Sequence, residues 1–271
     1  MFRQNLHTHS VWDDGQNTQE EMVQAARKAG LTSLGFSIHS YLPFAAEWTL
    51  LPERLPAYTR AMQTLKKTHA DEIAIYFGIE WDILSKSDLA VFDYVIGSIH
   101  QISIQDRDDC VDASPERTAD YLLNVFRGDA DAAAEAYFSQ YASLAKVDEV
   151  DIVGHFDLLT KFDEQGVFYK ADSPRFLSAA LAAMESLVFA GKIFEINTGA
   201  ISRGYRTTPY PSRALLQALR RMGGRITISS DSHSADSVAY GFDAAERLAL
   251  DCGYTEAWMF DGTAFVPVTI G

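Results

Sequence analysis

Residues 73–82 read Ile-Ala-Ile-Tyr-Phe-Gly-Ile-Glu-Trp-Asp. The run from Ile73 to Ile79 is apolar, which is typical of a strand buried in a sheet. Glu80 follows this run directly, and Asp82 lies two residues further on. The same order of apolar run, polar end and helix-like segment recurs along the chain. Residues 73–82 therefore predict one unit of a repeated strand-and-helix architecture.

The pattern predicts about seven such units. Further strands are expected at residues 2–6, 34–38, 94–99, 152–153, 193–196 and 226–228, with a final short strand at 258–260. Helices are expected between them, at residues 18–30, 53–70, 114–126, 129–145, 174–190, 212–222 and 241–252. Alternating strands and helices indicate a parallel sheet covered by helices. Seven units without a break favour a closed α/β barrel over an open sheet, with residues 1–271 as a single domain.

Length and charge narrow the class of protein. The chain has 271 residues, which suits one α/β barrel of roughly 250 residues. Hydrophobic residues make up 47% of it, enough for a sizeable core. The formal net charge is −14. This charge argues against nucleic acid or an anionic membrane as a partner, because both attract clustered lysine and arginine.

The cysteines and the N-terminal segment predict a cytoplasmic protein. Cys110 and Cys252 are the only cysteines, so we expect reduced thiols rather than a disulfide framework. The first ten residues, MFRQNLHTHS, contain no apolar segment of a secretory signal. No run approaches the roughly 18 apolar residues of a membrane span. The sequence does not predict an oligomeric state.

The positions of the histidines carry the most information about function. Six of the seven lie at or just after the end of a predicted strand, namely His7, His9, His39, His100, His155 and His233. The seventh, His69, lies near a helix end and is expected to be solvated. Carboxylates follow the strands at Asp14, Glu80 and Asp231, and Asn197 ends another strand. In a barrel these strand ends meet on one face, where active sites of such folds are built.

Converging imidazoles and carboxylates are typical of a metal site. The nine residues supply too many ligands for one ion, so two or three divalent ions are expected, with zinc, iron and manganese all suitable. His7 and His9 point to the same side of an extended segment, and Asp231 and His233 repeat that spacing. A histidine taken alone is more often structural, and Asp14 precedes a glycine as in an ordinary turn. Other strand-end acids are expected to cap turns or to hydrogen-bond the ligands, namely Asp13, Asp82, Asp93 and Asp157.

Seven motifs together resemble the PHP (polymerase and histidinol phosphatase) superfamily of metal-dependent phosphoesterases, and its histidinol-phosphatase branch in particular. The motifs are His7-Thr-His9 with Asp14-Gly15, Ser37-Ile-His39, Gly78-Ile-Glu80, Gly97-Ser-Ile-His100, Gly154-His155-Phe-Asp157, Glu195-Ile-Asn197-Thr-Gly199 and Ser230-Asp231-Ser-His233. The resemblance implies a distorted (β/α)7 TIM-like barrel with a trinuclear metal site at the C-terminal ends of its strands. It implies three ligand sets: His7, His9, Glu80 and Asp231; Glu80, His100 and His155; and Asp14, His39 and His233. Some family members have histidine near the position of Asp14.

The resemblance also implies an activity, the hydrolysis of L-histidinol phosphate in histidine biosynthesis. We expect a hydroxide between ions bridged by Glu80 to attack phosphorus. Either Asp231 or His233 is expected to protonate the leaving oxygen. Two alternatives stay open: a PHP phosphoesterase acting on another small monoester, such as a sugar or nucleotide phosphate, and a non-catalytic metal-binding PHP module.

Substrate contacts are expected from three loops. Arg203, Arg206 and Lys161 follow strands and could bind phosphate, with Arg203 the first choice because guanidinium matches phosphate geometry. The family often has an arginine one position earlier, where this chain has Ser202. The loop from Tyr41 to Trp48 is expected to cover the substrate. In this loop Glu47 would face a cationic amine, and Trp48 would contact the substrate or pack on the barrel mouth.

Overall fold

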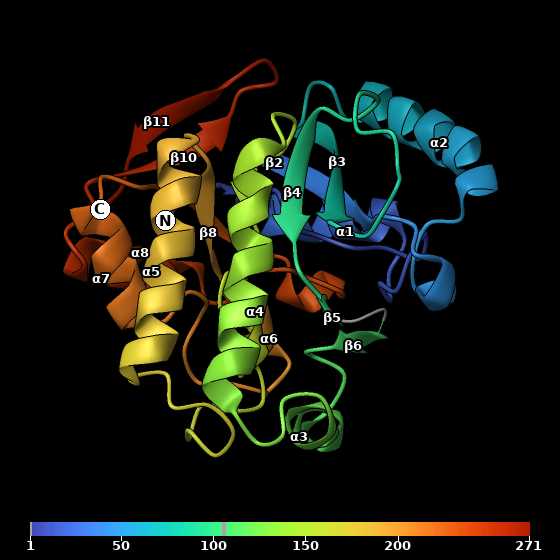
Figure 1. Ribbon diagram of the computed structural model, residues 1–271. Coiled ribbons are helices and arrows are strands. Elements are labelled where there is room, and N and C mark those ends of the chain that lie inside the picture. The colour runs from blue at the N-terminus through green and yellow to red at the C-terminus, as the bar shows by residue number, and fades with distance from the viewer. Residues whose placement is uncertain (1, 105–106) are drawn as a thin grey trace.

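The computed structural model describes residues 2–104 and 107–271, and its central feature is a seven-stranded parallel sheet (Figure 1). The strands, in spatial order, are β1 (Gln4–Asn5), β2 (Ser33–His39), β3 (Ala74–Asp82), β4 (Tyr94–Ser98), β7 (Ile152–Val153), β8 (Ile193–Asn197) and β9 (Arg225–Ser229). A parallel bridge between Thr8 and Ser232 joins the first and last strands of this order, and the His9 amide donates to the Ser232 carbonyl at 2.8 Å. The predicted (β/α)7 barrel is confirmed.

Helices fill the connections between these strands. They are α1 (Gln19–Lys28), α2 (Leu55–Thr68), α3 (Pro115–Asn124), α4 (Ala130–Ser143), α5 (Pro174–Phe189), α6 (Gly199–Ser202), α7 (Arg213–Arg221) and α8 (Phe242–Asp251). Short 3₁₀ turns lie at Pro43–Ala45, Pro52–Arg54, Leu144–Lys146, Leu158–Thr160 and Ala235–Ser237. Helix α1 begins with the expected capping box, in which Thr18 and Glu21 satisfy each other's backbone amides. Among the described residues, no helix is both long and apolar enough to cross a membrane.

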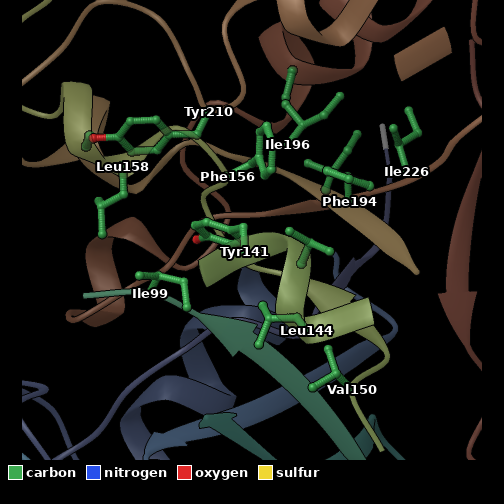
Figure 2. Close-up of a cluster of buried hydrophobic side chains, with 14 of the residues drawn as sticks. Ile99, Tyr141, Leu144, Val150, Phe156, Leu158, Phe194, Ile196, Tyr210 and Ile226 are labelled. Atoms are coloured by element: carbon green, nitrogen blue, oxygen red, sulfur yellow. The ribbon is translucent and has the colours of Figure 1, made fainter. Parts of the chain in front are cut away.

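The main core lies between the sheet and its helices. Figure 2 shows part of it, including Tyr141 of α4, Phe156 after β7, and Phe194 and Ile196 of β8. The ring of Phe138 lies 5.1 Å from that of Phe156 and 5.2 Å from that of Phe176, measured between ring centroids. All three rings are buried. This packing fixes α4 and α5 against the strands that precede His155 and Asn197.

A second, smaller core fills the barrel itself, and Tyr94 occupies its centre. The Tyr94 hydroxyl donates to the carbonyl of Leu6 on the opposite side of the barrel. A Cβ atom at Gly35 would lie 2.2 Å from the Tyr94 hydroxyl, and one at Gly78 would lie 2.1 Å from its ring. Only glycine leaves room for this ring on β2 and β3, so the glycines set the cross-section of the barrel.

Two antiparallel hairpins were not predicted as pairs. The hairpin β10 (Glu256–Phe260) and β11 (Phe265–Thr269) covers the N-terminal end of the barrel, where Phe260 packs on Tyr94. The sequence predicts only the first of its strands. The hairpin β5 (Gln101–Ile104) and β6 (Arg107–Cys110) lies beyond the C-terminal end of β4, together with α3 (Figure 1). It is an insertion at the C-terminal face.

The expectation of a solvated His69 is wrong. Its side chain is only 5% exposed and is held between two carboxylates, Glu20 of α1 at 2.9 Å and Glu72 at 2.8 Å. His69 is also the C-terminal cap of α2, where the helix dipole stabilises a positive charge. These hydrogen bonds, with Glu20 making the largest contribution, raise the pKa of His69 above its ordinary value.

This contact makes folding stability depend on pH. A raised histidine pKa stabilises the fold fully below the unfolded value of about 6.5, and this contribution is lost as pH rises through the folded pKa. Both carboxylates are largely exposed, so we expect a loss of about 1 kcal/mol or less. Urea unfolding of the wild type and His69→Asn between pH 6 and 9 should show their difference in stability shrinking with pH. A difference that stays constant would contradict the assignment.

Candidate metal centre

The barrel brings together the nine expected metal ligands, here called the strand-end cluster. They are His7, His9, Asp14, His39, Glu80, His100, His155, Asp231 and His233. His39 is the last residue of β2 and Glu80 lies near the end of β3, while the others follow their strands. Seven of the nine residues are buried, and only Asp14 and His233 reach solvent to a larger extent.

Glu80 is the centre of this cluster. Its Oε1 atom lies 2.8 Å from His155 Nε2 and 3.3 Å from His100 Nε2. Its Oε2 atom lies 3.0 Å from His39 Nδ1, and 3.2 and 3.5 Å from the Nε2 atoms of the two histidines after β1, His7 and His9. One carboxylate that is 2% exposed therefore faces five imidazoles. A carboxylate placed in this way can bridge metal ions.

Four overlapping groups have their donor atoms within 4.8 Å of one another. They are His7, His9 and Asp231; His7, Glu80 and His155; His39, Glu80 and His100; and His9, Asp14, His39 and His233. In the last group Asp14 lies 3.2 Å from His233 Nε2 and 3.5 Å from His39 Nε2. The spacing suits more than one ion, with neighbouring sites that share ligands.

Carboxylates behind the cluster hold its imidazoles in place. Glu195 of β8 lies 2.9 Å from His7 Nδ1 and accepts a hydrogen bond from the His155 amide at 2.7 Å. Asp13 lies 2.7 Å from His9 Nδ1. When these Nδ1 atoms donate a proton, the Nε2 atoms are left with lone pairs that face the cluster. Asp82, which accepts from the His100 amide at 3.0 Å, belongs to the same supporting layer.

The electrostatics of the cluster favour bound cations. Burial alone would lower the pKa of His7, but Glu195 and Glu80 outweigh it and raise that pKa well above its ordinary value. Burial would likewise lower the pKa of His9, yet Asp13 and other acids raise it to about 10. Burial would raise the pKa of Glu80, but the surrounding imidazoles hold it well below its usual range. The carboxylates are therefore ionised, and the site attracts positive charge.

Unpartnered atoms support the same interpretation. His7 Nε2, His9 Nε2 and His155 Nδ1 are among the buried polar atoms of the described residues that have no hydrogen-bond partner. A buried polar atom without a partner costs about 1–3 kcal/mol, and a metal ion would satisfy the two Nε2 atoms. The residues present therefore fit a group of divalent ions.

Asp231 is held in a strained conformation at the end of β9. Its φ is +45°, in the left-handed region that non-glycine residues rarely adopt. The Arg203 guanidinium donates to its carbonyl at 2.7 Å and lies 3.0 Å from its Oδ2 atom. A Cβ at Gly199 would lie 2.8 Å from the Asp231 Cβ and 3.0 Å from Arg203 Nη2. Glycine at 199 therefore allows Asp231 and Arg203 to meet beside the cluster.

A pocket of about 200 Å³ opens onto the cluster. It is lined by Asp14, Glu80, His100, Asp112, His155, Leu158, Lys161, Arg203, Tyr205, Asp231 and His233. Of the expected phosphate contacts, Arg203 and Lys161 line this pocket. The structure does not bring Arg206 to it, because that guanidinium bonds Thr160 and Thr208 and stacks 4.8 Å from the Tyr210 ring centroid. Arg206 holds loops together beside the pocket.

The loop from residue 41 to 48 lies against the mouth of the site. Trp48 meets His39 and His100 edge to face, with ring centroids 5.0 and 6.2 Å away. Glu47 is exposed and is not among the residues that line the pocket. A neighbouring cavity of about 370 Å³, lined mainly by apolar residues, also touches His39. The structure thus brings Trp48, but not Glu47, against the cluster.

Sequence reasoning assigns no role to three residues with polar side chains at the site, Glu195, Asp112 and Tyr205. Glu195 belongs to the motif Glu195-Ile-Asn197-Thr-Gly199, and its spacing of two from Asn197 is the signal that both side chains face into the barrel. Asp112 and Tyr205 line the pocket from loops. No periodicity marks a loop residue, so the sequence offers no comparable signal for these two.

The fold and the strand-end cluster define an α/β barrel with a candidate multi-metal centre at the C-terminal ends of its strands. The model of the PHP domain family matches residues 5–199, so the chain belongs to this family. The predicted membership of this family is thereby confirmed.

Relatives extend the likeness over nearly the whole chain. A histidinol-phosphatase of Lactococcus lactis is 27% identical over 97% of this chain and 96% of its own length. A histidinol-phosphatase of Bacillus subtilis is 24% identical, over 89% and 96%. A crystal structure of histidinol phosphate phosphatase from Lactococcus lactis, complexed with zinc, L-histidinol and phosphate, has a TM-score of 0.76 at 23% identity and covers 97% of this chain and 98% of its own. This structural likeness supports the fold.

Glu195→Gln should weaken metal binding without changing any of the nine cluster residues. The substitution removes the charge that orients His7 and makes its imidazole a better ligand, and loss of such a partner typically costs 10–100-fold in metal affinity, by a rough estimate. Competition with a chromogenic chelator measures this affinity. Glu185→Gln on the exposed side of α5 is the matched control. Equal zinc affinity in the folded wild type and Glu195→Gln would contradict the role of Glu195.

Proposed function

We propose that this protein hydrolyses L-histidinol phosphate to L-histidinol and inorganic phosphate, using two or three divalent ions in the strand-end cluster. The observation that carries the proposal is the joint geometry of the pocket. Five imidazoles surround the Glu80 carboxylate, and two cationic side chains, Arg203 and Lys161, line the same cavity. The likeness to histidinol-phosphatases over nearly the whole chain supports the choice of substrate.

The proposed ligand sets follow the distances in the cluster. His7, His9, Glu80 and Asp231 would hold one ion, since both Nε2 atoms lie 3.2–3.6 Å from the two carboxylates. A second set is Glu80, His100 and His155, and a third is Asp14, His39 and His233. Imidazole and carboxylate ligands suit zinc, iron and manganese. Ions bound there would supply Lewis acidity and a nucleophile active at neutral pH.

The chain's own cations would position the phosphate. A guanidinium has five N–H donors, and the bonds of Arg203 to Asp231 leave others for phosphate oxygens. Lys161 adds a point charge from another side of the pocket. Both lie beside the cluster, so they would place the phosphorus atom next to Glu80. Charge that builds on the phosphoryl oxygens would then be neutralised by groups already in place.

His233 is the more exposed of the two expected proton donors. Its side chain is 21% exposed and lines the pocket, whereas that of Asp231 is 8% exposed. Asp231 also faces the Arg203 guanidinium at 3.0 Å, which keeps its carboxylate ionised. His233 in turn belongs to the third ligand set, and burial lowers the pKa of its imidazole, which disfavours the protonated form that a general acid needs. We therefore assign both residues to metal binding rather than to protonation of the leaving oxygen.

Phosphate release measured across a panel of esters tests the proposal. Metal-replete protein should prefer L-histidinol phosphate, with kcat/KM of about 10⁴ M⁻¹s⁻¹ or more. The comparison esters are a sugar phosphate, a nucleoside monophosphate and 4-nitrophenyl phosphate.

Each other outcome has a defined meaning. Preference for a sugar or nucleotide phosphate would keep the phosphoesterase but replace the substrate. Metal binding without turnover of any ester would contradict an enzymatic role and identify a non-catalytic metal-binding module.

A further inference from the structure

Asp112 reaches the pocket because the inserted β5–β6 hairpin ends beside the strand-end cluster. Strand β6 ends at Cys110, and the amide of the next residue, Val111, donates to the carbonyl of His100 at 2.9 Å. This bond fixes the end of the hairpin against the metal centre. The side chain of Asp112 is 20% exposed and lines the pocket.

The carboxylate of Asp112 is ionised and tied to Lys161. Lys161 Nζ donates to the Asp112 carboxylate at 3.0 Å and to its carbonyl at 3.1 Å. Burial alone would raise the pKa of Asp112, but Lys161 and His100 hold it well below its usual range. A lysine has three N–H donors, so Lys161 keeps one for a phosphate oxygen. The rings of Phe162 and Tyr205 lie 5.3 and 5.0 Å from the ammonium and help to hold it.

Asp112 has capacity for a second cation. A carboxylate offers about four lone-pair positions. The described side-chain contacts of Asp112 use only some of them, for Lys161 and for a weak bond from Cys110 Sγ. Among the described residues that line the pocket, the other acids are Asp14, Glu80 and Asp231, all in the strand-end cluster. Asp112 is therefore the acid left for a charged group of the substrate.

We propose that Asp112 recognises the ammonium group of the substrate while Lys161, anchored on the same residue, contacts its phosphate. This inference rests on the proposed function, since it concerns a phosphate monoester of an amino alcohol. The ammonium group of the substrate would contact the Asp112 carboxylate, and its phosphate would contact the paired Lys161 ammonium. The site would then select esters that carry both charges, in place of the contact expected for Glu47.

The test compares two esters that differ only in the amine: L-histidinol phosphate and its deamino analogue, 3-(imidazol-4-yl)propyl phosphate. Asp112→Asn should lower kcat/KM for L-histidinol phosphate by about 10- to 100-fold, mainly through KM. The deamino ester should change less than about threefold. Asp120→Asn, an exposed acid on α3, is the matched control and should change neither. L-histidinol should also inhibit Asp112→Asn more weakly than the wild type, and thermal melting checks that each variant is folded.

The outcomes separate this inference from the proposed function. An equal loss for both esters would show that Asp112 only positions Lys161, and would overturn ammonium recognition. A selective loss in Glu47→Gln instead would assign the amine to the loop from residue 41 to 48. If the wild type hydrolyses L-histidinol phosphate and the deamino ester equally well, the amine contact fails while the proposed substrate stands. If it hydrolyses neither ester, the proposed function fails. Should Asp112→Asn not fold, Asp112→Ser gives the same comparison.

Discussion

A single buried carboxylate, that of Glu80, faces five imidazoles, and the closed barrel brings these groups together. The five histidines come from four different strand ends, those of β1, β2, β4 and β7. An open sheet would spread these ends apart, whereas the Thr8–Ser232 bridge closes them into a ring. Buried charges are costly unless they are paired, so the cluster depends on the closed barrel and suits cations bound within it.

The barrel keeps its narrow cross-section through tight packing at its other end. Tyr94 fills the interior where Gly35 and Gly78 leave room. Phe260 of the last hairpin packs on Tyr94 from the N-terminal end of the barrel. The N-terminal end is thus a closed apolar plug and the C-terminal end a charged pocket. This division between stability at one end and chemistry at the other is usual for α/β barrels.

Much of the cluster could be predicted because strand ends are visible in sequence. An apolar run followed by histidine or an acid identifies a strand and its C-terminal end together, as at Glu80 and His100. Loop residues give no such signal. Arg203 and Arg206 lie three residues apart, yet α6 turns Arg203 towards Asp231, and Arg206 bonds Thr160 instead.

The same limit applies to Asp112 and His69. Asp112 enters the pocket only because the β5–β6 hairpin is fixed on His100, a long-range contact that no local pattern encodes. His69 is buried by the packing of α2 on α1, although its helix-end position suggested exposure. Glu195 lies within the apolar strand β8, and the sequence alone does not show that its carboxylate contacts His7. Tertiary contacts, rather than local periodicity, decide all of these positions.

The central claim is that Glu80 organises a multi-metal centre, and metal stoichiometry tests it most directly. The wild type, equilibrated with zinc and desalted, should retain two or three ions per chain by elemental analysis. Glu80→Gln should retain at least one fewer, because the neutral amide cannot replace a charged ligand shared by neighbouring sites. Equal stoichiometry in the two folded proteins, or no metal in the wild type, would contradict the account.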